Sequence, residues 1–235
     1  MDLKTIALGL LVLNGLIILH ELGHFLAARR LRLDVPEFAV GFGPRLFSFT
    51  RGDTTYSLRL FPLGGYVLLP DLAPEPGEMV VSVRRRFLTV VAGPLANLLL
   101  VVVLMGPADT LRASVMWVGL LYGLLQDLVV GGGIQPGEEL LGPIGVSELV
   151  GQAASIGLYS LLRLTALLSL NLALFNLLPF PGLDGGRIVA LIIERLNGGR
   201  RSTWEPVVQA LGLLLFLGLG LWVTGRELLS YVGWL

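Results

Sequence analysis

Five long apolar runs organise the sequence, and polar residues gather in the segments between them. The runs cover residues 5–28, 87–105, 115–130, 156–178 and 207–223. A helix needs about 20 apolar residues to cross the hydrocarbon core of a bilayer. The pattern therefore predicts an all-α polytopic membrane protein whose spanning helices come from these runs.

The composition supports a chain that lies largely in a bilayer. Hydrophobic residues make up 54% of the 235 residues and charged residues only 14%, whereas about 25% of residues are charged in soluble domains. The 17 basic and 17 acidic residues cancel, which removes the electrostatic support for a nucleic-acid partner. The absence of cysteine excludes disulfides, thiolate zinc ligands and a cysteine nucleophile.

Basic residues predict the orientation of the spans, because cytoplasmic loops carry an excess of Lys and Arg. Thirteen of the 17 basic residues fall in two segments, between the first and second runs and between the fourth and fifth. The segment 106–155 contains only Arg112, together with five acidic residues. We expect both basic segments on the cytoplasmic side and the acidic segment outside.

The third run, residues 115–130, is interrupted by Gln126 and Asp127. If it crossed the membrane, the basic segment around Arg187 would lie outside, against the charge bias. An interfacial or re-entrant helix is therefore favoured, and a full span is the alternative. The preferred arrangement has both chain ends outside and four spans, at about residues 5–28, 87–105, 156–178 and 207–223.

The segment 38–69 has a different pattern, with glycines and prolines among aromatic and β-branched residues. Residues 48–50 and 54–60 are typical of two short strands around a tight turn at Gly52. We expect a membrane-associated β-hairpin here. A further hypothesis is that its edge, around residues 49–60, pairs with an extended segment of a substrate.

The two histidines of the chain, His20 and His24, lie inside the first apolar run with Glu21 between them. In this HExxH pattern the residues at i and i+4 share one helix face, so two imidazoles can bind one zinc ion beside a carboxylate. Zinc lowers the pKa of a bound water towards about 7, and the carboxylate can then take its proton. The alternatives are a polar contact between helices and a cleaved signal peptide at residues 1–28.

A third zinc ligand has to be a carboxylate or a backbone group, because no other His and no Cys is present. Asp184 follows an apolar stretch broken by Pro179 and Pro181, and irregular backbone at membrane depth survives only where it is buried or lines a cavity. Helix rise places His20 about 20 Å below the external end of its run, near the depth at which Asp184 follows the fourth run. Asp184 is the candidate third ligand, with an ordinary turn aspartate as the alternative.

At these residues the chain resembles the site-2 protease family of intramembrane zinc metalloproteases. The paired motifs are HELGH at residues 20–24 and NLLPFPGLDGG at residues 176–186. The resemblance extends to VGFGPRLFSF, FPLGGYV and RRRFLTVVAGPLAN, and it covers most of residues 1–105 and 140–190. It implies zinc-dependent hydrolysis of peptide bonds within or next to membrane-spanning segments, often after another protease has trimmed the external domain of the substrate.

The resemblance also implies roles for individual residues. His20, His24 and Asp184 would bind one Zn²⁺ per chain, and Glu21 would be the general acid/base. Asn176 would contact the substrate backbone or the developing oxyanion.

The chain departs from the family pattern in one respect. Many bacterial members carry PDZ domains before the span that leads to the aspartate, but here only about fifty residues separate residues 105 and 156. We therefore expect a member without a PDZ domain and without PDZ-mediated partners.

Asn97 is a second candidate for substrate binding. It either lines the active-site cavity or makes a polar contact between spans, where Gly93 and Ala96 permit close packing. The three consecutive arginines at residues 84–86 are expected to anchor the second span at the cytoplasmic surface.

The predicted protein is a single domain over residues 1–235, in the plasma membrane of a prokaryote, with its active site towards the cytoplasm. Its expected partners are the lipid bilayer and, as substrates, single-span membrane proteins or signal-peptide remnants. Two rival interpretations are a membrane-anchored zinc peptidase for soluble peptides and a metal transporter or inactive scaffold. The position of Asp184 argues against the first. The intact ligand set with Glu21 argues against a scaffold, and a single metal-binding cluster in the sequence argues against a transport path.

Overall fold

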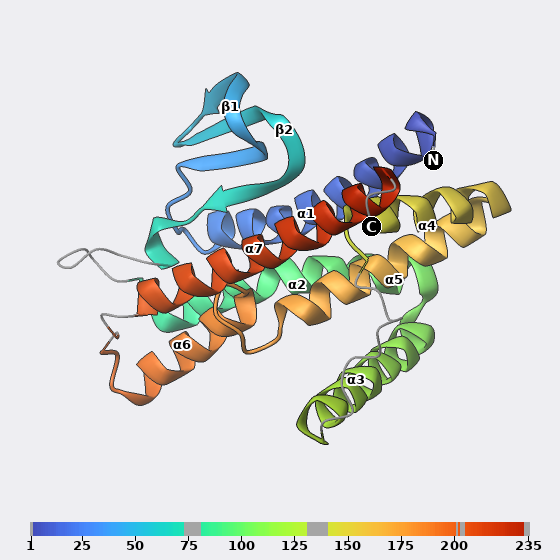
Figure 1. Ribbon diagram of the computed structural model, residues 1–235. Helices are drawn as coiled ribbons and strands as arrows, with labels where there is room; N and C mark the ends of the chain where they lie inside the picture. Colours follow the sequence, from blue (N-terminus) through green and yellow to red (C-terminus); the bar gives the residue numbers. More distant parts are fainter. Residues whose placement is uncertain (1, 73–80, 131–140, 201, 203–204, 233–235) are drawn as a thin grey trace.

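The computed structural model describes residues 2–72, 81–130, 141–200, 202 and 205–232. In this part of the chain, α1 (Leu3–Arg30), α2 (Val83–Met105), α5 (Leu158–Asn176) and α7 (Glu205–Val232) are long and apolar enough to cross a membrane. In Figure 1 they run along one common direction, and α1 begins at the end of the bundle where α7 finishes. The expectation of a helical membrane protein with four spans is confirmed.

Three further helices accompany the spans: α3 (Pro107–Val130), α4 (Pro143–Ile156) and α6 (Asp184–Leu196). The helix expected at residues 115–130 begins earlier, and it projects away from the bundle in Figure 1. Its interfacial or re-entrant placement stays a prediction. Helix α4 was not expected from the sequence; it ends at Ile156, where the predicted fourth run begins, and Gly157, with a φ of 143°, breaks the chain between α4 and α5.

Helix α4 packs on α1 and is attached to α7 by one carboxylate. Glu227 of α7 accepts backbone hydrogen bonds from Gly142, Ile144 and Gly145, at 2.7 to 3.2 Å. These N–H groups belong to the first turn of a helix, where no intrahelical acceptor is available. The partial positive charge of the helix N-terminus stabilises the carboxylate, so Glu227 fastens the last span to α4.

The β region contains two strands, β1 (Glu37–Arg51) and β2 (Thr54–Leu68), followed by the 3₁₀ turn η1 (Pro70–Leu72). Residues 45–51 pair antiparallel with residues 54–59 around Gly52, which has a φ of 60°. The strands are longer than expected because residues 37–40 also pair, with residues 65–68 on one side and residues 55–58 on the other. Residues 55–58 are therefore paired on both sides and cannot take up a substrate strand, whereas residues 49–51 pair on one side only among the described residues, so the expected edge is confined to that strand and its pairing with a substrate stays a prediction.

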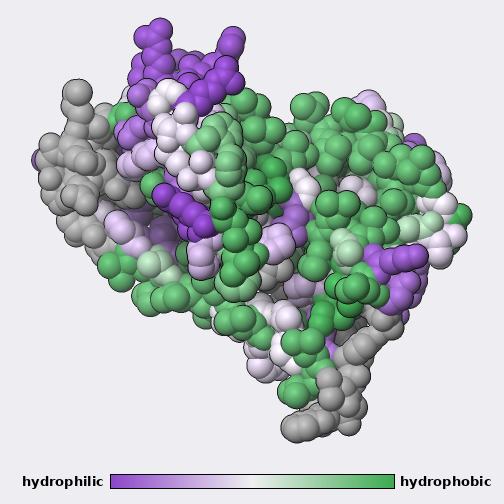
Figure 2. Space-filling model, turned by 90° about the horizontal axis from the view of Figure 1, so that it is seen from above, coloured by the Kyte–Doolittle hydropathy of each residue, from purple (hydrophilic) through white to green (hydrophobic). Residues whose placement is uncertain are grey.

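Polar contacts hold this sheet together and fix it to α1. Glu37 is buried in it, and burial would raise the pKa of its carboxyl; hydrogen bonds from Ser57, Arg59, Tyr66 and Arg45 outweigh that effect and lower the pKa to about 2. On the α1 side, Asn14 accepts a hydrogen bond from the Gly64 N–H. Figure 2 shows hydrophilic residues gathered over the β region and apolar residues over the helices.

A buried ion pair joins α2 to α6. Arg86 is 1% exposed and Glu194 is 3% exposed, and the guanidinium donates two hydrogen bonds to the carboxylate. Of the three arginines expected to be surface anchors, Arg84 and Arg85 are exposed. Arg86 corrects the expectation, because its charge lies inside the protein and fixes the helix that begins with Asp184.

Replacing Arg86 with Ala is expected to destabilise the protein by about 3–5 kcal/mol, because it leaves the Glu194 carboxylate buried without its partner. The double variant Arg86→Leu/Glu194→Leu should be less destabilised, since it removes both charges together. Thermal unfolding in detergent measures both effects, and Arg85→Ala is the matched exposed control. Equal unfolding temperatures for Arg86→Ala and Arg85→Ala would contradict the structural role of the pair.

Candidate metal centre

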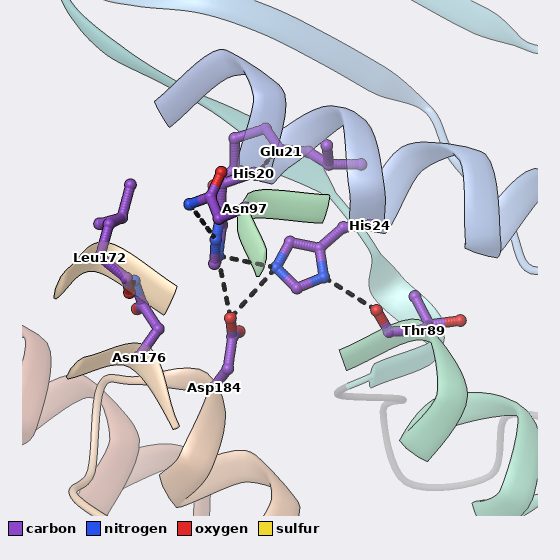
Figure 3. A network of polar contacts seen from close by, with 9 residues as sticks. His20, Glu21, His24, Thr89, Asn97, Leu172, Asn176 and Asp184 are labelled. Carbon is purple, nitrogen blue, oxygen red and sulfur yellow. Dashed lines mark hydrogen bonds and ion pairs between the residues drawn. The ribbon is translucent and has the colours of Figure 1, made fainter. Parts of the chain in front are cut away.

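The two histidines lie on one face of α1. His20 and His24 are one helical turn apart and are 5% and 7% exposed, and their rings meet edge to face with centroids 4.8 Å apart. Figure 3 shows both rings pointing from α1 towards the start of α6. The i, i+4 spacing thus brings two imidazole nitrogens together inside the protein, as the sequence predicted.

Asp184, the first residue of α6, completes the cluster. Its Oδ2 lies 3.0 Å from His20 Nε2 and 3.2 Å from His24 Nε2, and the two Nε2 atoms are 3.2 Å apart. Burial raises the pKa of Asp184, but the hydrogen bonds from the two imidazoles outweigh it and hold the pKa well below its ordinary value. Among the described residues, this is the single group of three side chains that could hold a metal ion.

The three donor atoms fit a zinc ion. Zinc binds imidazole nitrogen and carboxylate oxygen at about 2.0–2.2 Å, so tetrahedral geometry separates neighbouring donors by about 3.3 Å. The observed separations of 3.0 to 3.2 Å match this spacing closely. Three protein ligands also leave a fourth position for water or substrate, which is the arrangement of catalytic zinc sites.

Helix α2 supports the cluster from the side. The Thr89 carbonyl accepts a hydrogen bond from His24 Nδ1 at 2.8 Å, which leaves the Nε2 lone pair free for a metal. Gly93 brings the α2 backbone against both rings: a Cβ at this position would overlap His24 Nε2 and come within 2.8 Å of His20 Nε2. The sequence suggested only that Gly93 permits close packing of helices. The structure shows that its missing side chain also leaves room for both imidazole rings.

The segment between α5 and α6 places Asp184. A Cβ on Gly185 or Gly186 would overlap backbone carbonyl groups of this segment, so the two glycines allow it to fold tightly. From α7, Gln209 accepts a hydrogen bond from the Gly182 N–H at 2.7 Å, and Gly212 lies against the Pro181 carbonyl. The last span thus braces the segment that carries the carboxylate.

Glu21 does not join the three donor atoms. Its side chain extends towards β2, where Oε2 accepts a hydrogen bond from the Val67 N–H at 3.1 Å. One carboxylate oxygen is thereby held by the sheet, and the residue sits on α1 directly after His20.

The two candidate asparagines come from different helices and make different contacts. Asn176, at the end of α5, is partly buried and donates a hydrogen bond to the Leu172 carbonyl at 2.9 Å. Asn97 of α2 is fully buried, with its Nδ2 3.4 Å from His20 Nδ1. The structure therefore places both near the cluster, but only Asn97 contacts a histidine.

Comparison with known proteins identifies the family. The family model described as peptidase family M50 matches residues 8–219, most of the chain. The chain belongs to peptidase family M50. This is the site-2 protease family that the HELGH and NLLPFPGLDGG motifs resemble, so the resemblance is confirmed.

Curated M50-like relatives carry matching names. The chain is 26% identical to "Putative zinc metalloprotease CPE1693" of Clostridium perfringens over 329 aligned positions, which cover 95% of the chain and 98% of that protein. It is 25% identical to "Probable membrane metalloprotease ARASP2, chloroplastic" of Arabidopsis thaliana over 357 positions, covering 97% and 81%. Both alignments are longer than the 235 residues of the chain, so these relatives contain segments without a counterpart here.

Membership of the M50 family settles the class of enzyme. The protein is a zinc metalloendopeptidase of the site-2 protease type, and zinc is its cofactor. Its four apolar helices and its family make it a multi-pass membrane protein. The predictions of enzyme class and cofactor are confirmed.

Proposed function

We propose that this M50 protease hydrolyses peptide bonds within or next to the membrane-spanning segments of single-span proteins or signal-peptide remnants, as a step of regulated intramembrane proteolysis. The observation that carries the proposal is the convergence of His20, His24 and Asp184 at zinc-donor spacing beside spanning helices. We further propose that residues 1–235 form one domain that works without a PDZ domain.

The proposed roles follow from the donor atoms of each side chain. His20 and His24 hold zinc through Nε2, and Asp184 holds it through a carboxylate oxygen. Zinc bound there supplies a Lewis acid that polarises the scissile carbonyl and lowers the pKa of water. Glu21 takes a proton from the attacking water and later gives it to the leaving amine nitrogen.

The contact between Glu21 and β2 supports this role. Glu21 Oε2 accepts a hydrogen bond from the Val67 N–H, and this bond fixes the orientation of the Glu21 side chain. Its other oxygen, Oε1, is the one that we assign to proton transfer. Asn176 is partly buried at the end of α5, and its Nδ2 donates to the Leu172 carbonyl; its Oδ1, an acceptor, makes no hydrogen bond to another described residue. We assign it to contact with the substrate backbone or with the developing oxyanion.

The substrate class can be tested by presenting one sequence in two forms. A single-span helix in lipid vesicles and the same segment as a soluble peptide are compared with purified, zinc-loaded enzyme. We expect faster cleavage of the embedded helix, and complete loss of cleavage after zinc is removed with a chelator. Preferred cleavage of the soluble peptide would favour the membrane-anchored peptidase instead.

The proposed orientation puts the zinc site towards the cytoplasm and the start of α3 outside. Since the chain has no cysteine, single cysteines can be introduced cleanly at the exposed Ala108 and, as the opposite-side control, at the exposed Asn197. A membrane-impermeant maleimide added to intact cells should label Ala108→Cys and spare Asn197→Cys. The reverse labelling would overturn the proposed topology.

A further inference from the structure

The amide of Asn97 is the least satisfied buried polar group beside the zinc cluster. Asn97 is 0% exposed, and its Oδ1 has no hydrogen-bond partner among the residues that the structure describes. The residue is held firmly, because Ser169 of α5 donates a hydrogen bond to its backbone carbonyl at 3.0 Å. An unpartnered buried acceptor is costly, so its presence next to a ligand calls for a reason.

Zinc binding creates a need for an acceptor at His20. The ring uses Nε2 towards Asp184 and His24, so a neutral ligating imidazole must carry its proton on Nδ1. For His24 the corresponding Nδ1 already has an acceptor, the Thr89 carbonyl. For His20 the neighbouring polar group is the Asn97 amide, 3.4 Å from Nδ1.

We propose that Asn97 is a positioning residue for His20, whose Oδ1 accepts the Nδ1–H hydrogen bond when Nε2 binds zinc. A half turn of the amide about Cβ–Cγ exchanges Oδ1 and Nδ2 in the same space. The turn breaks no hydrogen bond of Oδ1, since that atom has no partner in the described part of the chain. It moves Nδ2 from its 3.4 Å contact with His20 Nδ1 to the former place of Oδ1, and His20 Nδ1–H gains an acceptor in exchange. Asn97 and the Thr89 carbonyl then act alike, each fixing the tautomer and ring orientation of one histidine.

This role differs from both roles that the sequence suggested for Asn97. A fully buried side chain does not reach a substrate, and a plain contact between spans does not explain an unpartnered Oδ1 next to a ligand. The inference rests on zinc ligation by His20, which belongs to the proposed function above. Asn176 keeps the proposed contact with the substrate.

The test is the zinc dissociation constant of purified variants, measured by competition with a chromophoric chelator. Asn97→Leu, which keeps the bulk but has no acceptor, should weaken zinc binding by about 10–100-fold. Asn97→Asp, which keeps an acceptor oxygen, should stay within a few-fold of the wild type. Asn171→Ala, an exposed asparagine on α5 that contacts Trp117 of α3, is the control and should leave affinity unchanged.

Two further readouts separate positioning from packing. The visible absorption spectrum of the Co²⁺-substituted protein reports ligand geometry, and it should change in Asn97→Leu but not in Asn171→Ala. The unfolding temperature of each metal-free variant checks folding, and Asn97→Ala, which removes the acceptor without adding bulk, has the same expected loss of affinity as Asn97→Leu. Equal losses in Asn97→Leu and Asn97→Asp, or no loss in either, would overturn the proposal.

His20→Ala in the same assay distinguishes the two levels of the argument. If His20→Ala retains wild-type zinc affinity, the ligand set of the proposed function is wrong. If His20→Ala loses zinc while Asn97→Leu and Asn97→Ala bind it normally, the ligand set stands and the positioning role is wrong. With zinc saturating, an increase in KM without a change in zinc affinity would assign Asn97 to substrate binding instead.

Discussion

Glu21→Gln is expected to lower cleavage of a single-span substrate by about 10²–10⁴-fold, the range of general acid–base catalysis, while zinc content stays at the wild-type level. Gln cannot take a proton from water, but its carbonyl oxygen can still accept the Val67 N–H that holds Glu21 in the structure. The proposed zinc donors are three other side chains, so the metal should be retained. Cleavage rates and metal analysis of the same preparation give both quantities.

Glu148→Gln is the matched control, because Glu148 is exposed on α4. It should cut at the wild-type rate. If Glu21→Gln binds zinc fully and cuts as fast as the wild type, Glu21 is not the general base. If it loses zinc instead, Glu21 belongs to the metal site and the proposed division of roles is wrong.

Gly93→Ala is expected to weaken zinc binding by at least about 100-fold, the upper range for changes next to a ligand, and to lose activity in proportion. The added methyl would overlap His24 Nε2 and approach His20 Nε2, so it occupies the space between the donor atoms. Zinc affinity by chelator competition is the decisive measurement. The helix itself should tolerate the change, because Ala is a better helix former than Gly.

The control for this variant is Gly15→Ala in α1, where a Cβ would meet no atom within 4 Å. It should keep both zinc affinity and activity. Normal zinc binding by Gly93→Ala would show that α2 does not approach the imidazoles as closely as the structure has it.

Much of the fold could be predicted because the thickness of the bilayer sets the length of each apolar helix. The side of the membrane on which a loop lies is in turn reflected in its number of arginines. The predictions missed the short helix α4, which lies before the predicted fourth run. Helix α4 has 14 residues, too few to cross a membrane, and Glu148 and Gln152 interrupt its apolar sequence, so hydropathy does not indicate it. The break between α4 and α5 depends on the backbone of Gly157, which hydropathy does not report.

The three side chains of the candidate metal centre could be picked out from the sequence, but the groups around them could not. The helical period alone places the two histidines of HExxH on one face of a helix. Asp184 is recognisable as an acidic residue that follows an apolar stretch broken by prolines. Thr89 contributes a backbone carbonyl, which any residue would supply, so its type carries no signal. Gly93 is equally compatible with ordinary packing between helices, and only the position of α2 against α1 shows that it faces the metal site.

The ion pair of Arg86 and Glu194 has a consequence for the order of biogenesis. Its partners are 108 residues apart, and His20 is 164 residues from Asp184. Translation therefore delivers the arginine and both histidines to the membrane long before their acidic partners exist. We expect α6, once it emerges, to pair Glu194 with the buried Arg86 and to bring Asp184, the proposed third ligand, to the histidines. With the proposed ligand set, a chain interrupted before that point lacks one of the three donors, so we expect proteolytic activity only in molecules whose synthesis has passed α6.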